Sequence, residues 1–152
     1  MTHEEKARAY FLEGYNCSQA VVLAFADEVG LPADVLAKLA SSFGGGMGRM
    51  REVCGAVSGM FMVAGLLHGY DDPKAGTEKA AHYALIQQLA AEFKQELGCH
   101  SIICRELLGV EGNSTAPTPA ARTAEYYRKR PCVDLVGAAA RVMAAHLPPH
   151  AK

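Results

Sequence analysis

Five cysteines are the residues of this chain with the greatest capacity for chemistry. A cysteine thiolate attacks disulfides and binds soft metal ions, so cysteines that meet in the fold predict redox or metal chemistry. No CxxC motif is present, which argues against thioredoxin-type exchange, and the long spacings match no zinc-finger or ferredoxin signature. The tertiary fold must therefore bring the cysteines together. In chain order they are Cys17, Cys54, Cys99, Cys104 and Cys132.

The odd number of cysteines argues against a complete disulfide framework, and the start of the chain does not resemble a secretory signal. The opening segment, MTHEEKARAYFLEGYNC, has acidic residues where a signal would have a basic and then an apolar region. The longest uncharged run, residues 53–67, is shorter than the roughly 20 residues that a membrane span needs. We therefore expect a cytoplasmic protein with no membrane span and with reduced cysteines.

The composition limits the class of protein further. Half of the 152 residues are hydrophobic and 20% are charged, which is typical of a globular domain with a real core. The net charge of -1 gives no electrostatic basis for nucleic-acid binding. We expect residues 1–152 to form a single domain with no nucleic-acid partner.

Apolar residues recur at helical rather than alternating spacing, which predicts an all-α protein, a bundle of about six to eight helices. Asn16 is a good N-cap, and Gly14, Gly30, Gly69 and Gly98 are expected to end helices. The predicted helices span residues 4–13, 16–29, 32–42, 53–67, 71–98, 101–109, 123–130 and 132–147, with a glycine loop at 44–48 and an exposed connection at 109–121.

Three cysteines fall at predicted helix starts, namely Cys17, Cys54 and Cys132. Free backbone N–H groups and the positive end of the helix dipole stabilise a thiolate there, which lowers the thiol pKa below its usual value of about 8.5. Nearby basic side chains add positive charge in the same direction. Arg49 and Arg51 precede Cys54, and Arg128, Lys129 and Arg130 precede Cys132.

The stretch GGGMGRMREVCGAVSG, residues 44–59, contains six glycines. Glycine costs roughly 1 kcal/mol relative to alanine in a helix interior, so this density predicts a close approach of the backbone to a neighbour. Gly55 and Gly59 lie four residues apart on a predicted helix, where small residues let another helix pack closely. The same apolar face would suit a homodimer interface, so a homodimer is a further expectation.

Four blocks of the sequence are similar to a known family: GYNCSQAV, SSFGGGMGRMREVCGAVSGMFMVAGLLHG, FKQELGCHSIICRELLG and RPCVDLV. In order and spacing they resemble the C-GCAxxG-C-C family of redox-active proteins, over about residues 14–145. The resemblance implies an all-helical domain whose clustered cysteines are Cys17, Cys54, Cys104 and Cys132. Cys99 stands outside that set.

Three interpretations of these cysteines remain open. The first is an electron-transfer site in which Cys17, Cys54, Cys104 and Cys132 bind an iron–sulfur cluster or another metal ion, and which serves an unknown redox partner. The second is a metal-free thiol/disulfide redox protein. The third is a non-enzymatic helical binding or assembly domain with structural cysteines. For either redox interpretation, we expect Cys54 and Cys104 to carry the chemistry.

Cys99, which stands outside the family set, allows this choice of site residues to be tested. We expect Cys54→Ser to abolish metal or redox activity and Cys99→Ser to be tolerated. The reverse result would move the centre to the segment that joins Cys99, His100 and Cys104.

Overall fold

The computed structural model describes residues 1–109 and 115–149, apart from the side chains of Arg128 and Lys129. Within that part of the chain the protein is all-α, as predicted, and its only β feature is an isolated bridge between Val53 and Ile103. Of the predicted connection 109–121, residues 110–114 lie outside the described residues. In chain order the helices are α1 (His3–Glu13), α2 (Cys17–Ala24), α3 (Ala26–Val29), α4 (Ala33–Ala40), the 3₁₀ helix η1 (Ser41–Phe43), α5 (Gly44–Met47), α6 (Gly55–His68), α7 (Gly76–Leu97), α8 (Cys104–Leu108), α9 (Ala124–Lys129) and α10 (Cys132–Ala144).

Local chemistry fixes the first two helix starts. Thr2 accepts a hydrogen bond from the backbone N–H of Glu5, whose side chain accepts one in return, which forms a capping box at α1. Asn16 and Gln19 form the same arrangement at α2. Gly14 adopts the left-handed conformation that ends α1, so the chain turns sharply between the two helices.

Several predicted helices have different bounds in the structure. The helix expected over 71–98 begins only at Gly76. The helix expected over 16–29 breaks at Phe25, whose φ of -110° and ψ of 17° are not helical. Pro32 is the N-cap of α4 rather than a residue of its first turn, and α4 continues into η1. The helix expected over 101–109 is shortened to α8, because residues 101–103 run extended beside Val53.

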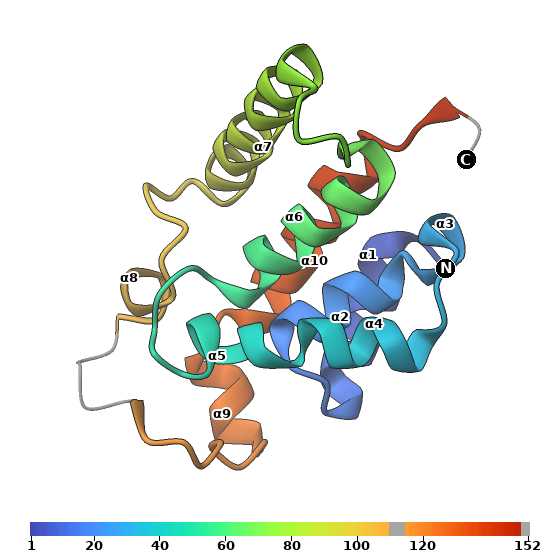
Figure 1. The fold of residues 1–152 in the computed structure, drawn as a ribbon. Coiled ribbons are helices and arrows are strands. Elements are labelled where there is room, and N and C mark those ends of the chain that lie inside the picture. Colours follow the sequence, from blue (N-terminus) through green and yellow to red (C-terminus); the bar gives the residue numbers. More distant parts are fainter. Residues whose placement is uncertain (110–114, 150–152) are drawn as a thin grey trace.

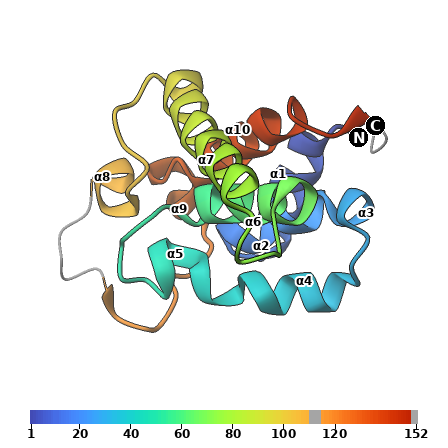
Figure 2. The same ribbon diagram turned by 45° about the horizontal axis from the view of Figure 1, so that its top comes forward.

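The core forms around α2, which packs against α1, α4, α6 and α10, while α10 also packs against α1, α6 and α7 (Figure 1). One hydrophobic cluster joins these helices. The first half of α7 extends beyond the bundle, so Ala81 is exposed although the sequence pattern placed it on the apolar stripe. Leu89 and Phe93, further along α7, are fully buried. Figures 1 and 2 both show α5, α8 and α9 grouped at the end of the bundle that lies away from the chain termini.

The apolar run that the sequence singled out forms α6, which has 14 residues. At 1.5 Å per residue this length is far below the hydrocarbon thickness of a bilayer, which is about 30 Å. Across residues 1–109 and 115–149, no helix combines the length and the apolar character that a membrane span requires.

Gly59 sets the distance between α6 and α2. A Cβ at Gly59 would lie 2.8 Å from the carbonyl oxygen of Ser18 and 3.1 Å from the Cβ of Val21. The predicted close helix contact is therefore present, and it is made within one chain. This glycine face of α6 is covered by α2, so a homodimer, which stays a prediction, would need another surface.

Replacing Gly59 by leucine should lower the free energy of unfolding by about 1–3 kcal/mol, because the side chain would overpack the α2–α6 contact. Gly65→Leu is the matched control, since a Cβ at Gly65 meets nothing within 4 Å on the same helix. Chemical denaturation of both variants measures the difference. Equal unfolding midpoints for the two variants would show that α2 and α6 adjust to the added side chain without loss of stability.

Candidate functional site

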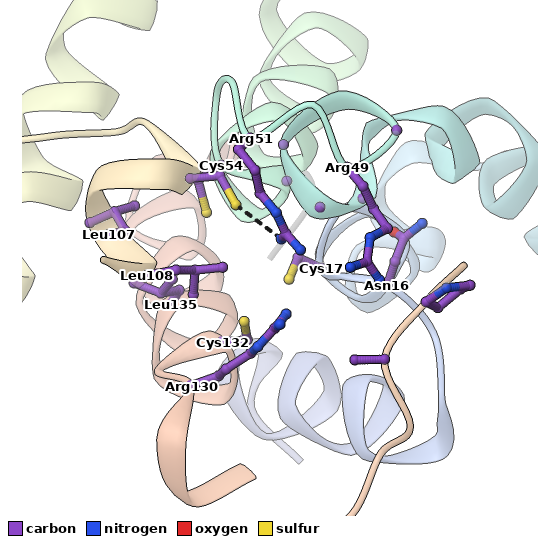
Figure 3. A pocket seen from close by; sticks show the side chains of 18 of the residues that line it. Asn16, Cys17, Arg49, Arg51, Cys54, Leu107, Leu108, Arg130, Cys132 and Leu135 are labelled. Carbon is purple, nitrogen blue, oxygen red and sulfur yellow. Dashed lines mark hydrogen bonds between the residues drawn. The ribbon is translucent and has the colours of Figure 1, made fainter. Parts of the chain in front are cut away.

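Four of the five cysteines line one cavity of about 290 Å³. Figure 3 shows the labelled cysteines of α2, α6 and α10 around this space. The expected clustering is therefore present at the level of a shared cavity. The four are Cys17, Cys54, Cys104 and Cys132, the set implied by the family resemblance.

Each of these cysteines lies at a helix start. Cys17 and Cys132 are the first residues of α2 and α10, and Cys54 is the N-cap of α6, as the sequence predicted. Cys104 is also the first residue of its helix, α8, which the sequence did not predict. Tertiary pairing places it there, because its N–H donates to the carbonyl of Glu52 at 2.6 Å.

Cys17 and Cys132 line the same cavity, and each changes the pKa of the other. The interaction with Cys17 lowers the pKa of Cys132 to about 7, and the charges of Arg130 and Arg122 act in the same direction against the effect of burial. The same interaction, together with burial, raises the pKa of Cys17 well above its usual value. Cys132 is therefore the thiol of the two that ionises first, whereas Cys17 stays protonated near neutral pH.

Burial has the largest effect on the thiol pKa of the other two cavity cysteines, Cys54 and Cys104. It raises the pKa of Cys54 to about 12, although the backbone N–H groups of Val57 and Ala56 donate to this sulfur and lower its pKa. It also raises the pKa of Cys104, against the hydrogen bond from Arg51. The pKa of Cys132 is lowered, as expected, but Cys17 and the arginines lower it rather than the helix start. The expectation is wrong at Cys17, because of its interaction with Cys132 and then of burial, and at Cys54, because burial outweighs the backbone N–H groups.

Arg51 is a buried charge at this site, with only 2% of its surface exposed. Its Nη1 donates to the Sγ of Cys104 at 3.7 Å, a contact that the sequence, which placed Arg51 next to Cys54, did not predict. Arg49 also lines the cavity. Its pKa is lowered by burial and by the neighbouring charges of Arg51 and Arg130.

Arg122 and Tyr126 also line the cavity, and neither was predicted from the sequence. Arg122 donates to the carbonyl oxygens of Phe11 and Tyr15, at 2.9 and 3.0 Å, and its guanidinium lies over the ring of Phe11. Tyr126 lies beneath the guanidinium of Arg130, with 4.8 Å between the cation and the ring centroid. No local signal marks Arg122, because its partners Phe11 and Tyr15 are more than 100 positions away in the chain.

A family model described as "Putative redox-active protein (C_GCAxxG_C_C)" matches residues 15–146 of the chain. The chain belongs to this family. The comparison with curated proteins found no match, and neither did the comparison with solved structures. The matched segment contains all four cavity cysteines, so membership supports the assignment of a redox-active protein at this coarse level.

Cys99 lies outside the cavity of this C-GCAxxG-C-C protein. Its half-buried thiol donates to the carbonyl of Ser101 at 3.4 Å, and the adjacent His100 is exposed. Neither residue joins Cys104 in a common site. This position is consistent with the expectation that Cys99 stands apart from the family set.

The four cavity thiols fit a metal centre in chemical type but not in placement. Thiolates are suitable ligands for iron–sulfur clusters and for zinc. Among the residues that the structure describes in this C-GCAxxG-C-C protein, no group of three or more His, Cys, Asp or Glu side chains is placed to hold a metal ion. The arrangement instead separates into a Cys17–Cys132 pair and an Arg51–Cys104 contact.

Proposed function

We propose that this C-GCAxxG-C-C protein is a dithiol/disulfide redox protein, with Cys132 as the attacking thiolate and Cys17 as its partner. The observation that carries the proposal is that these two cysteines, the first residues of α2 and α10, line one cavity together with Arg122 and Arg130. A thiol that attacks efficiently at neutral pH needs a pKa close to that pH, and about 7 meets this condition for Cys132. This interpretation now takes precedence over a metal centre.

Each residue of the pair has a distinct role in the proposed reaction. The thiolate of Cys132 attacks a substrate disulfide, and the charges of Arg130 and Arg122 stabilise it beforehand. Cys17 remains protonated until the mixed disulfide has formed on Cys132. Loss of its proton then lets it attack the Cys132 sulfur and close an internal disulfide, which releases the reduced substrate.

Cys54 and Cys104 are not the reacting thiols in this proposal. Burial raises the pKa of both thiols, so both are neutral and weakly nucleophilic at pH 7. We therefore propose Cys17 and Cys132 for the chemistry that the sequence analysis assigned to Cys54 and Cys104.

Mild oxidation of the reduced protein tests this assignment. We expect the free-thiol count to fall by two, and mass spectrometry of proteolytic fragments to find Cys17 linked to Cys132. The Cys99→Ser variant should give the same result, because Cys99 lies outside the cavity. A link between Cys54 and Cys104 would contradict the assignment, and an unchanged thiol count would favour structural cysteines.

A metal centre for electron transfer is the second candidate, since four thiols line one cavity. When bound, an iron–sulfur cluster would supply one-electron chemistry, and Cys17, Cys54, Cys104 and Cys132 would be its ligands. The side chains would have to rearrange to meet it. Anaerobic purification followed by iron, zinc and sulfide analysis tests this candidate: stoichiometric metal would establish it, and a colourless, metal-free, active protein would reject it.

The cellular context proposed for the protein follows from its thiol chemistry. We infer a reducing compartment, the cytoplasm, because a reactive dithiol must be reduced again after each cycle. An unknown redox partner would supply those electrons. We also infer one domain over residues 1–152, since one hydrophobic cluster joins α1, α2, α6 and α10.

A further inference from the structure

The cysteine cavity concentrates positive charge that no described carboxylate neutralises. Arg49, Arg122 and Arg130 line it, and none of the lining residues within 1–109 and 115–149 is Asp or Glu. Elsewhere in the protein, Arg8 and Arg141 each make ion pairs with two carboxylates. The ion pairs of the described residues include none with Arg49, Arg122 or Arg130. Among the described residues this contrast favours an anionic ligand as the negative partner of these arginines.

Arg49 is the cavity arginine whose side chain most clearly lacks a hydrogen-bond acceptor. Its Nε atom is buried and has no hydrogen-bond partner among the residues that the structure describes. The nearby charges of Arg51 and Arg130 further disfavour its charged form. A buried N–H without an acceptor is unfavourable, so an anion in the cavity would satisfy both the donor and the charge.

The backbone that carries Arg49 and Arg51 is itself strained. Their φ angles are 68° and 62°, in the left-handed region that residues with a side chain rarely adopt. Hydrogen bonds hold this loop in place, among them Arg51 N–H to the carbonyl of Gly45 at 3.2 Å and Arg49 N–H to that of Gly44 at 3.3 Å. Such strain concentrates at functional sites, and here it accompanies two guanidinium groups that reach the cavity.

We propose that the cavity binds a small disulfide that bears carboxylate groups, held by the positive charge of Arg49, Arg122 and Arg130 next to Cys132. The inference rests on the proposed dithiol function and adds a substrate class to it. A volume of about 290 Å³ suits a small molecule. Arginine is well suited to carboxylates, because its planar N–H donors bind both oxygens. The arginines also offset the repulsion between the Cys132 thiolate and an anionic substrate.

The proposed reaction balances without a further co-reactant in a single turnover. The Cys132 thiolate attacks one sulfur of the substrate, the substrate S–S bond breaks, and one carboxylate-bearing thiolate leaves. Cys17 gives its proton to that leaving thiolate and attacks the Cys132 sulfur, which releases the second thiolate. The Cys132 thiolate and the Cys17 thiol are oxidised to one disulfide, and one substrate disulfide is reduced to one thiol and one thiolate.

Binding is tested separately from chemistry with thiodipropionate, a dicarboxylate thioether that thiols cannot reduce. Calorimetry at low salt should detect binding to the reduced protein, and Arg49→Gln should weaken it by about tenfold or more. Lys74→Gln makes the same charge change at an exposed residue outside the cavity and should bind as the wild type does. Absence of binding would overturn the proposal, as would equal binding of neutral thiodiglycol or of inorganic phosphate.

Single-turnover reduction then compares three small disulfides: anionic dithiodipropionate, neutral hydroxyethyl disulfide and cationic cystamine. We expect the anionic disulfide to react at least about tenfold faster than the neutral one, the cationic one to be slowest, and Arg130→Gln to reduce the preference. Equal rates for all three would overturn the charge-selective site while the dithiol function stands. Binding of thiodipropionate without reduction of any disulfide would support the anion site and reject the dithiol function. Melting curves of both arginine variants confirm that they remain folded.

Discussion

Cys132→Ser should remove the fast reaction of this protein with iodoacetamide at pH 7. A thiol with a pKa of about 7 is roughly half ionised at that pH, whereas one with a pKa of about 12 is ionised to about one part in 10⁵. We expect the alkylation rate constant to fall by about tenfold or more, because the thiolate is the reacting form. The measurement is best made in a Cys99→Ser background, which removes the half-buried thiol outside the cavity.

The rate of alkylation should fall as the pH is lowered. Below pH 7 the Cys132 thiolate takes up a proton, so the rate should fall about tenfold between pH 8 and pH 6. Cys54→Ser is the matched control: its sulfur is buried and neutral at pH 7, so the rate and its midpoint should stay at wild-type values. A normal midpoint near 8.5 in the wild type, or loss of the fast reaction in Cys54→Ser, would contradict the assignment of Cys132.

Gly46→Ala should be the most destabilising single methyl addition in the glycine loop. Gly46 has a φ of 71°, and a Cβ there would lie 2.6 Å from the Cβ of Cys104, 2.8 Å from the backbone nitrogen of Glu52 and 2.9 Å from the Cα of Arg51. Left-handed strain costs about 1–2 kcal/mol and overpacking about 1–3 kcal/mol, so the expected loss is ~2–5 kcal/mol. Thermal denaturation should show a decrease in Tm of about 5–20 °C.

Gly48→Ala separates the two contributions. Gly48 has a similar φ of 60°, but its Cβ would meet only the carbonyl oxygen of Ser42, at 3.9 Å. It should therefore lose only the strain contribution, about 1–2 kcal/mol. Equal losses for Gly46→Ala and Gly48→Ala would show that the approach of the loop to Cys104 is not close in solution.

Local patterns in the sequence are sufficient to predict the helical class and most helix boundaries. Asn16 caps α2 through a contact three residues away, and Gly98 ends α7 in the left-handed conformation. These are short-range effects that depend on residue type alone. For the same reason, the positions of Cys17 and Cys132 at helix starts could be predicted. The set of four cysteines followed from the family resemblance.

Boundaries that depend on distant segments could not be predicted in this way. Cys104 begins α8 because its N–H bonds to Glu52, more than 50 positions earlier in the chain. The predicted helix over 101–109 was therefore too long. Ala81 follows the apolar spacing of α7 but is exposed, because no other helix covers that end of α7.

The sequence by itself determined that this is a helical protein and that Cys17, Cys54 and Cys132 lie at helix starts, because capping and apolar spacing act over a few residues. Only the tertiary structure decided which cysteine is ionised, since thiol pKa values depend on burial and on neighbours brought from other helices. Cys54 and Cys132 both lie at a helix start, yet burial raises the pKa of Cys54 while the interaction with Cys17 lowers that of Cys132. The convergence of Arg49, Arg122 and Cys132 on one cavity is likewise a property of packing, because the loop, α1 and α10 meet there from distant parts of the chain.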